Sequence, residues 1–105
     1  MAGSAFVVLL RVHLFFPDAG SLKAKRAELN RIKAWLRDRL GAAVAEVDGQ
    51  DTWQRSVLAV SLVAGTVGGA QDRADTVERF LDSRFPQGVR VERRLASWSD
   101  LEALG

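Results

Sequence analysis

The sequence contains no cysteine, and this absence removes several classes of function. Disulfide bonds, thiolate catalysis and zinc or iron–sulfur sites with cysteine ligands are all excluded. Histidine occurs once, as His13, so a histidine-rich metal centre is excluded as well. We therefore predict neither a metal site nor another cofactor, and we interpret the isolated histidine as a surface or packing residue.

Long hydrophobic runs are also absent. The N-terminal apolar stretch AFVVLL stops at Arg11 and is too short to cross a bilayer. No basic segment precedes it, although a secretory signal peptide would have one. We expect no membrane partner, and the sequence predicts a cytoplasmic protein.

The bulk composition is that of a soluble globular protein. A chain of 105 residues fits one domain with one core, and its contents of 48% hydrophobic and 27% charged residues are ordinary for such domains. We assign residues 1–97 to a single domain. Residues 98–105 are predicted to be a C-terminal tail that forms a helical turn or frays.

Positive charge is concentrated in one segment of the chain. Residues 21–40 hold seven Lys or Arg against two acidic residues, a net charge of +5. The other 85 residues hold eight basic and eleven acidic residues, a net charge of −3. The sequence therefore predicts one basic surface on a slightly acidic body.

Hydrophobic periodicity separates strands from helices. Alternation over residues 5–14 predicts a strand, and helical spacing over residues 21–40 predicts a helix with Ser21 as N-cap and Gly41 as its stop. The inward positions of the strand are Phe6, Val8, Leu10, Val12 and Leu14. The apolar stripe of the helix consists of Leu22, Leu29, Ile32, Leu36 and Leu40.

The remaining elements complete a recognisable order. Strands are predicted at residues 42–48, 53–64 and 88–95, and a second helix at 70–84, after GTVGG breaks the preceding strand. The order β-α-β-β-α-β is typical of the ferredoxin-like sandwich. The sequence thus predicts an α+β fold, in which two helices cover one face of a four-stranded antiparallel sheet.

Two stretches carry a resemblance to a known family. SLKAKR at the start of the first helix and VAEVDGQDTWQRSVLAV across the predicted hairpin resemble the YlxP-like family of small bacterial proteins, over roughly residues 5–95. The resemblance implies a ferredoxin-like fold and no established enzymatic activity. Genes of this family tend to lie among those for translation initiation and ribosome maturation. The turn GTVGGA and the tail with Trp98 have no counterpart in the family pattern.

The first helix carries a polar ridge beside its apolar stripe. With Leu22 at 0° and about 100° per residue, the ridge falls between about 20° and 100°. Its members are Lys23, Arg26, Asn30, Lys33 and Arg37. A row of cations suits a polyanion, because several phosphates are neutralised together and counterions are released. The alternative is a solvated helix face whose Lys and Arg stems shield the core edge.

The hairpin EVDGQDTWQR combines a large aromatic with charged groups near a turn. Trp53 could stack on a base or a protein partner, with Gln54 and Arg55 as polar contacts. We favour a structural role, in which Trp53 covers the open end of the sandwich and Asp51 caps the turn. Glu46 and Arg55 are predicted to pair across the strands. Oxygen ligation of a cation by Glu46, Asp48 and Asp51 is a weaker alternative.

The outward face of the predicted sheet has no helix to cover it. Its apolar positions on the first and third strands are Val7, Leu9, Val57, Ala59 and Val63. An exposed apolar patch of this kind invites a partner, and a homodimer is the simplest one. An RNA-recognition motif would place stacking aromatics on this face. We identify none among the outward positions, so base stacking there is not expected.

Two hypotheses of different classes follow. The first is a non-enzymatic module that binds ribosomal RNA or a ribosome-assembly intermediate through the ridge of the first helix, with local contacts from the hairpin. The second is a protein-interaction or regulatory module that dimerises through the uncovered sheet face while the ridge is merely solvated. An enzyme that uses Glu46, Asp48 or Asp51 is a third and weaker alternative.

Overall fold

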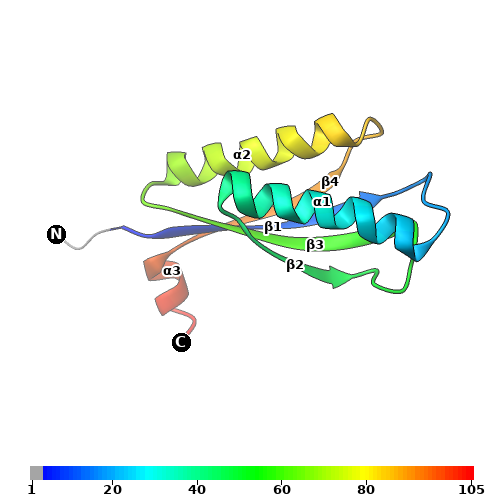
Figure 1. Ribbon diagram of the computed structural model, residues 1–105. Helices are drawn as coiled ribbons and strands as arrows, with labels where there is room; N and C mark the ends of the chain where they lie inside the picture. Colours follow the sequence, from blue (N-terminus) through cyan, green and yellow to red (C-terminus); the bar gives the residue numbers. More distant parts are fainter. Residues whose placement is uncertain (1–3) are drawn as a thin grey trace.

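A four-stranded antiparallel sheet with the strand order β2-β3-β1-β4 forms the centre of the computed structural model, which describes residues 4–105 (Figure 1). Helices α1 and α2 cover one face of this sheet. The elements are β1 (Phe6–Phe15), α1 (Leu22–Leu40), β2 (Ala43–Asp48), β3 (Arg55–Ala64), α2 (Val67–Arg84), β4 (Arg90–Ser97) and α3 (Trp98–Glu102). The predicted ferredoxin-like βαββαβ order is therefore confirmed.

The core lies between the helices and the inward side of the sheet. Strand β1 pairs with both β3 and β4, and its predicted inward residues from Val8 to Leu14 are all buried. Leu29, Ile32 and Leu36 of α1 pack against them, as do Val77 and Leu81 of α2. Burying one such aliphatic side chain stabilises the fold by about 1.5–3 kcal/mol.

Both predicted caps of α1 are present. The hydroxyl oxygen of Ser21 accepts a hydrogen bond from the Ala24 amide at 3.1 Å, and Gly41 ends the helix with φ of 64°, a conformation that favours glycine. Leu22 does not belong to the buried stripe, however, because it is 44% exposed in the first turn. The buried face of α1 instead begins at Lys25, which is fully buried.

Helix α2 begins three residues before the predicted start. The sequence GTVGG was expected to form only a break, but Thr66 caps a helix that already includes Val67. The Thr66 hydroxyl oxygen accepts a hydrogen bond from the Gly69 amide at 2.9 Å. A Cβ atom at Gly69 would lie only 2.9 Å from this oxygen, so the small residue keeps the cap accessible. The glycines thus belong to the first turn of the helix.

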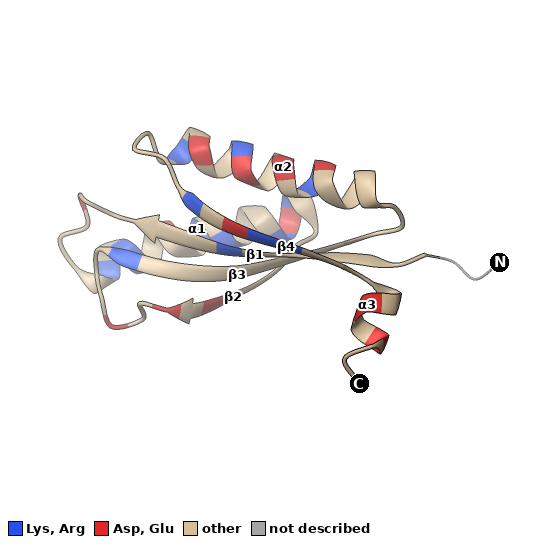
Figure 2. Cartoon of the chain, turned by 180° about the vertical axis from the view of Figure 1, so that it is seen from behind, with Lys and Arg blue, Asp and Glu red and all other residues tan. Residues whose placement is uncertain are grey.

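The C-terminal tail forms a short third helix on the side of the sheet away from α1 and α2 (Figures 1 and 2). Ser97 and Asp100 form a reciprocal capping box, and the Trp98 amide donates to the Ala5 carbonyl oxygen at 2.9 Å. Trp98 and Leu101 are 64% and 46% exposed. Helix α3 therefore leaves apolar groups uncovered beside the start of β1.

Among residues 4–105, no helix combines the length and the hydropathy that crossing a membrane requires.

Candidate functional site

The two stretches that carry the family resemblance meet in space. The fully buried ammonium group of Lys25 donates to the carbonyl oxygens of Gly49 and Thr52, each at 2.5 Å. Lys25 belongs to SLKAKR at the start of α1, whereas Gly49 and Thr52 form the turn between β2 and β3. The first turns of α1 thus hold the hairpin in place through one buried cation.

Glu46 completes this buried cluster. Its carboxylate accepts hydrogen bonds from Arg26 at 2.7 Å and from the Ser56 hydroxyl at 2.6 Å, and it lies 3.7 Å from the Lys25 ammonium group. Burial alone would raise the pKa of Glu46, but these hydrogen bonds and the two positive charges outweigh it and hold the pKa below its ordinary value. Because its side chain is already engaged, Glu46 is a structural anion.

The predicted pairing of Glu46 with Arg55 is wrong. Strand β2 pairs with β3 in regular register up to Glu46, which lies opposite the buried Leu58 on the inward face, and a β-bulge between Glu46 and Asp48 then places Asp48 opposite Val57. Arg55 instead contacts the Asp48 carboxylate at 3.2 Å on the outer surface. The acidic residues of the hairpin therefore do not converge, and no group of three or more potential metal ligands exists among residues 4–105.

The structural roles expected of Asp51 and Trp53 are not observed. The turn is capped by Asp48, whose carboxylate accepts from the Gly49 amide at 2.8 Å, while Asp51 is exposed and has no hydrogen-bond partner among residues 4–105. Trp53 is 50% exposed and does not close the sandwich. The end of the core is closed by Phe16 and Phe85, whose rings pack edge-to-face with centroids 5.6 Å apart. Gln54 contributes its carbonyl oxygen, which accepts from the Phe16 amide at 2.7 Å.

The basic ridge of α1 lies along the side of the helix that faces β2. Arg26 contacts Glu46, and Arg37 donates to the Val44 carbonyl oxygen at 3.3 Å, so both arginines of the ridge contact this edge strand. Lys23 and Arg37 are exposed and Lys33 is partly exposed. None of these three has a carboxylate partner among residues 4–105. The ridge therefore keeps three uncompensated cations, with exposed Asn30 between them.

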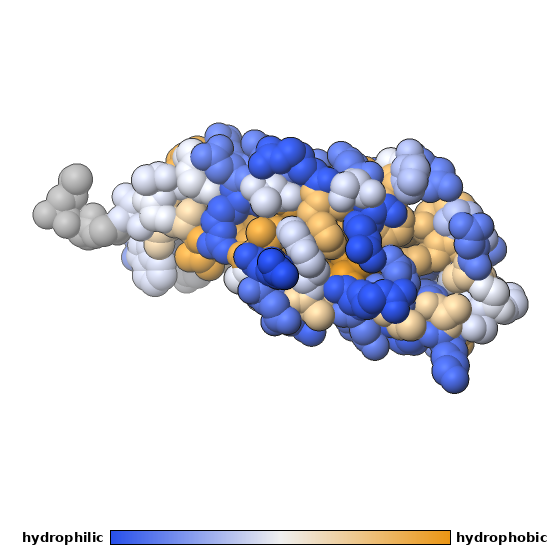
Figure 3. Space-filling view, turned by 45° about the horizontal axis from the view of Figure 1, so that its top comes forward, coloured by the Kyte–Doolittle hydropathy of each residue, from blue (hydrophilic) through white to orange (hydrophobic). Residues whose placement is uncertain are grey.

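The helix face as a whole is largely hydrophilic, with apolar side chains showing between the helices (Figure 3). Trp35 of α1 and Phe80 of α2 stack in parallel with ring centroids 3.6 Å apart, and both are partly buried. This pair joins the two helices at the edge of the core. The unpaired cations of α1 lie on the opposite flank of the helix, which faces β2.

The uncovered sheet face is only partly apolar. Leu9 and Val63 are 49% and 64% exposed, and Val7 and Ala59 are partly buried. Val57 is 4% exposed, so its expected place in an exposed interface is wrong. It lies between His13 of β1 and Asp48 of β2, inside the sheet rather than at its margin. Of the predicted apolar positions, the exposed ones, Leu9 and Val63, therefore lie in the half of this face nearer to α3.

The other half of this face is charged. Arg11 and His13 of β1 both contact Glu92 of β4, at 2.7 Å each, and Arg90 lies 3.2 Å from the His13 ring. The hydrogen bonds from Arg11 and His13, together with the charges of Arg11 and Arg90, lower the pKa of Glu92 to about 2. His13, which has no acidic neighbour in the sequence, gains one through strand pairing.

Strand β1 also reaches one pleat further than predicted. Phe15 is its last residue, shares the outward face with Arg11 and His13, and is 55% exposed. The inference that the outward positions carry no aromatic is therefore wrong. Of the two neighbouring phenylalanines, only Phe16 is buried at the end of the core.

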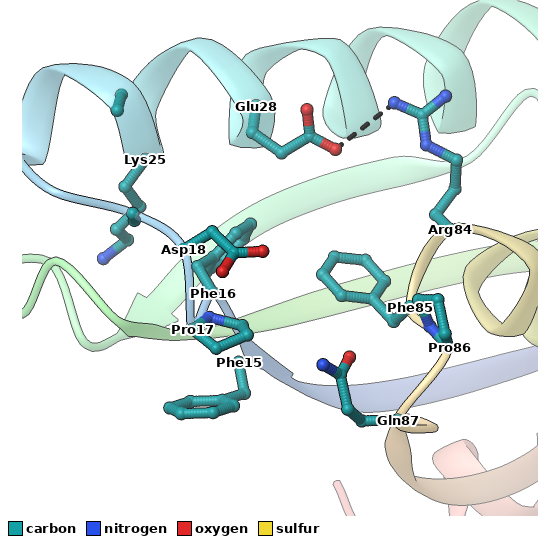
Figure 4. A pocket seen from close by; sticks show the side chains of 12 residues that line it. Phe15, Phe16, Pro17, Asp18, Lys25, Glu28, Arg84, Phe85, Pro86 and Gln87 are labelled. Carbon is teal, nitrogen blue, oxygen red and sulfur yellow. Dashed lines mark hydrogen bonds and ion pairs between the residues drawn. The ribbon is translucent and has the colours of Figure 1, made fainter.

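A hollow of about 380 Å³ opens at the end of the sandwich where Phe15 lies (Figure 4). It is bounded by the loop residues 15–19 and 84–87 and by the first turns of α1. The sequence reasoning missed this hollow, although a signal existed: both loops contain the dipeptide Phe-Pro, at Phe16–Pro17 and Phe85–Pro86. Two such rigid loops at one end of the sandwich form the walls of a preformed pocket.

Comparison with known proteins shows the family to which the chain belongs. The family model described as "Protein of unknown function (DUF503)" matches residues 7–94. The "Uncharacterized protein YlxP" of Bacillus subtilis (strain 168) is 37% identical over 77 residues, which are 73% of this chain and 83% of that protein. The de novo designed protein Foldit4 shares the fold, with a TM-score of 0.58 and 14% identity over 88% of this chain and 96% of the design. The chain belongs to the DUF503 family, as its resemblance to YlxP-like proteins predicted.

Proposed function

We propose that the protein is a non-enzymatic module that binds RNA along the exposed flank of α1, with ribosomal RNA or a ribosome-assembly intermediate as its partner. One observation carries this proposal. Lys23, Lys33 and Arg37 form a row on one helix flank, and none has a carboxylate partner among residues 4–105. Uncompensated cations in a row bind phosphates because several counterions are released together.

The dimensions of the row suit a polyanion. Lys23 and Arg37 are fourteen positions apart in one helix, which corresponds to about 21 Å along its axis. Arg26, between them, is held by Glu46 and contributes its remaining donors to the hairpin backbone at Gln50. We therefore assign phosphate contacts to Lys23, Lys33 and Arg37, and a positioning role to Arg26.

Two of the three hairpin acids, Glu46 and Asp48, are engaged in structural contacts. Glu46 is engaged by Lys25, Arg26 and Ser56, and Asp48 contacts Arg55. A general acid or base needs a free carboxyl group within reach of its substrate. The contacts of these two residues are those of a structural cluster.

The salt dependence of RNA binding tests the proposal. Three phosphate contacts predict a slope of roughly −2 to −3 for the logarithm of the binding constant against the logarithm of salt concentration. Neutralising two ridge positions with Lys33→Gln and Arg37→Gln should flatten the slope by about 1.5–2. The matched control, Arg31→Gln with Arg39→Gln, makes the same charge change on the same helix but off the ridge, and should matter less.

Two results would contradict the proposal. Equal losses in both double variants would mean that RNA responds only to overall charge. Absence of binding to structured RNA at low salt would exclude the function and favour a protein partner.

A second candidate function rests on a different observation. Leu9 and Val63, opposite the helices, are 49% and 64% exposed, and the apolar Trp98 and Leu101 of α3 lie uncovered on the same side of the sheet. We propose that a second copy of the chain covers this apolar half, so that the protein acts as a dimeric interaction module. Such a dimer leaves the α1 ridge accessible, because the ridge lies on the other side of the sheet.

A further inference from the structure

The hollow between the two Phe-Pro loops has a lining suited to a planar ring. Its volume of about 380 Å³ lies in the range of small-molecule sites. Phe15, Pro17 and Pro86 supply apolar walls, and Figure 4 shows Phe15 on the side away from α1. Exposed aromatic surface of this kind lies open to stacking with a flat partner.

Most of the charged groups in the hollow already have partners. Glu28 accepts hydrogen bonds from Arg31 at 2.6 Å and from Arg84 at 3.2 Å, and the hydrogen bond from Arg31 is the main reason that its pKa is lowered. The ammonium group of Lys25 is engaged by Gly49 and points away from the hollow. A ligand in the hollow would therefore find the charged groups of Lys25, Glu28 and Arg84 already engaged by other parts of the protein.

Asp18 and Gln87 are the polar lining residues left without a partner among residues 4–105. An ionised carboxylate only accepts hydrogen bonds, so Asp18 selects a ligand that presents N–H donors. A carboxylate or phosphate group at the same point would be repelled. Gln87 can both donate and accept, which suits a ring edge with mixed groups.

The hollow lies at the same end of α1 as Lys23, the first residue of the basic ridge. Ala24 and Lys25 line it, and Lys23 directly precedes them at the start of α1. The apolar walls, the unpaired acceptor and a cation at the same end of the helix are the groups that one nucleotide of a bound strand would use.

We propose that this hollow holds one unstacked, amino-bearing nucleobase of single-stranded RNA, with its ring against Phe15 and its Watson–Crick edge donating to Asp18. Guanine fits best, because its neighbouring N1–H and N2–H donors match the two oxygens of one carboxylate. Uracil fits worst, since carbonyl oxygens flank its one ring donor. This inference rests on the proposed RNA-binding function and names the kind of RNA that the site selects.

The test compares oligonucleotides of equal length and charge. Fluorescence anisotropy would measure the binding of a uridine octamer and of the same octamer with one central guanosine, so the phosphate contacts are identical. We expect the guanosine strand to bind about tenfold more tightly, in keeping with the discrimination of one paired carboxylate. A fully paired RNA duplex, which offers no free base, should show no such preference.

Two variants test whether Phe15 and Asp18 are responsible for the preference for guanosine. Phe15→Ala should weaken guanosine-strand binding by about 5- to 100-fold, the range for one base–aromatic stack. Asp18→Asn should reduce the preference for guanosine to about one while leaving the salt slope unchanged. Both side chains are exposed, so circular dichroism should show a folded protein in each case. The control Val63→Ala changes an exposed apolar residue on another part of the sheet and should keep both properties.

Competition with free guanosine monophosphate distinguishes a base that belongs to an RNA strand from a base that belongs to a free nucleotide. If the strand is the ligand, as proposed, the mononucleotide should compete far less well than the octamer. Competition by the mononucleotide at concentrations comparable to those of the octamer would overturn the assignment to RNA and indicate a nucleotide site.

The oligonucleotide measurements also distinguish failure of the base site from failure of RNA binding by the ridge. Salt-dependent binding with no preference for guanosine, or a preference that survives Asp18→Asn, overturns the base site and leaves the ridge intact. Absence of binding to any strand at low salt overturns both.

Discussion

The buried ammonium group of Lys25 donates to the carbonyl oxygen of Gly49 over 2.5 Å, and this contact joins the start of α1 to the turn between β2 and β3. Gly49 has φ of 81°, and a Cβ atom there would lie 2.7 Å from the Arg55 carbonyl oxygen. The turn therefore needs both the glycine and the lysine. Their joint occurrence explains why two stretches separated in sequence form one motif.

Replacing Lys25 should strongly destabilise the protein. Lys25→Met would remove the buried charge that pairs with Glu46 and the ammonium donor to the carbonyl oxygens of Gly49 and Thr52, at a cost of about 3–5 kcal/mol. Urea denaturation measures this loss. Lys23→Met, two positions earlier and exposed, is the matched control and should stay within about 0.5 kcal/mol. Similar losses in the two variants would show that the buried cation has no special role.

Trp53→Ala should cost only about 1 kcal/mol, because half of the side chain is already exposed. Truncating a fully buried large aromatic costs about 3–5 kcal/mol by comparison. Trp35→Ala is expected to be the more harmful change, since Trp35 stacks on Phe80 between the helices. Thermal or urea unfolding of the two variants provides the comparison. A larger loss for Trp53 would mean that it packs more tightly than its exposure indicates.

The stability of the protein should fall in acid partly through Glu92. Hydrogen bonds from Arg11 and His13 lower its pKa from 4.5 to about 2 in the folded state. The stabilisation is thus complete above the ordinary value and is lost as the pH falls from about 4.5 to about 2. Glu92→Gln should make stability less dependent on pH in this window.

Denaturation at several pH values, together with carbon-13 NMR titration of the Glu92 carboxyl group, provides the measurement. Glu28, Glu46 and Asp100, whose pKa values are also lowered, account for the slope that should remain in the variant. An unchanged slope in Glu92→Gln, or a Glu92 midpoint near 4.5, would contradict the prediction.

Leu9→Lys and Val63→Lys should weaken a homodimer by at least tenfold without unfolding the chain, because both positions are exposed in one copy. Light scattering over a concentration series measures the change. Leu22→Lys is the matched control, since Leu22 is similarly exposed but lies on α1. Val57→Lys would be uninformative about assembly, as Val57 is buried within the chain. A wild-type protein that stays monomeric at high micromolar concentration would exclude this interface.

Periodicity was sufficient to predict the fold because local spacing determines which side chains face inward. The alternation in β1 is confirmed from Val8 to Leu14, and the middle of the α1 stripe, Leu29, Ile32 and Leu36, is buried as predicted. The contacts of Glu46 were beyond such reasoning. Alternation with Val44 already places it on the inward face, but its partners Arg26 and Lys25 belong to α1, and their approach depends on how the helix packs on the sheet.

Lys25 was overlooked because it was counted with a run of basic residues. On the helical wheel it falls at about 300°, within the apolar stripe centred near 330°. A lysine at that position indicates a buried partner rather than a solvated face. The hollow at the C-terminal end of β1 could likewise be suspected from the repeated Phe-Pro dipeptides, but its volume and its unpaired Asp18 depend on how the two loops approach each other.

The placement of β1 in the middle of the sheet has a consequence for biosynthesis. The first strand to leave the ribosome pairs with the third and the last strands, so that Val8 meets both Leu62 and Leu95. Until the final strand has emerged, one side of β1 has no partner, and the growing chain exposes an apolar strand edge. Pairings this distant in sequence also close slowly. The sheet of the nascent protein should therefore be complete only after β4 has emerged, and ribosome profiling of chaperone contacts should show them persisting until that point.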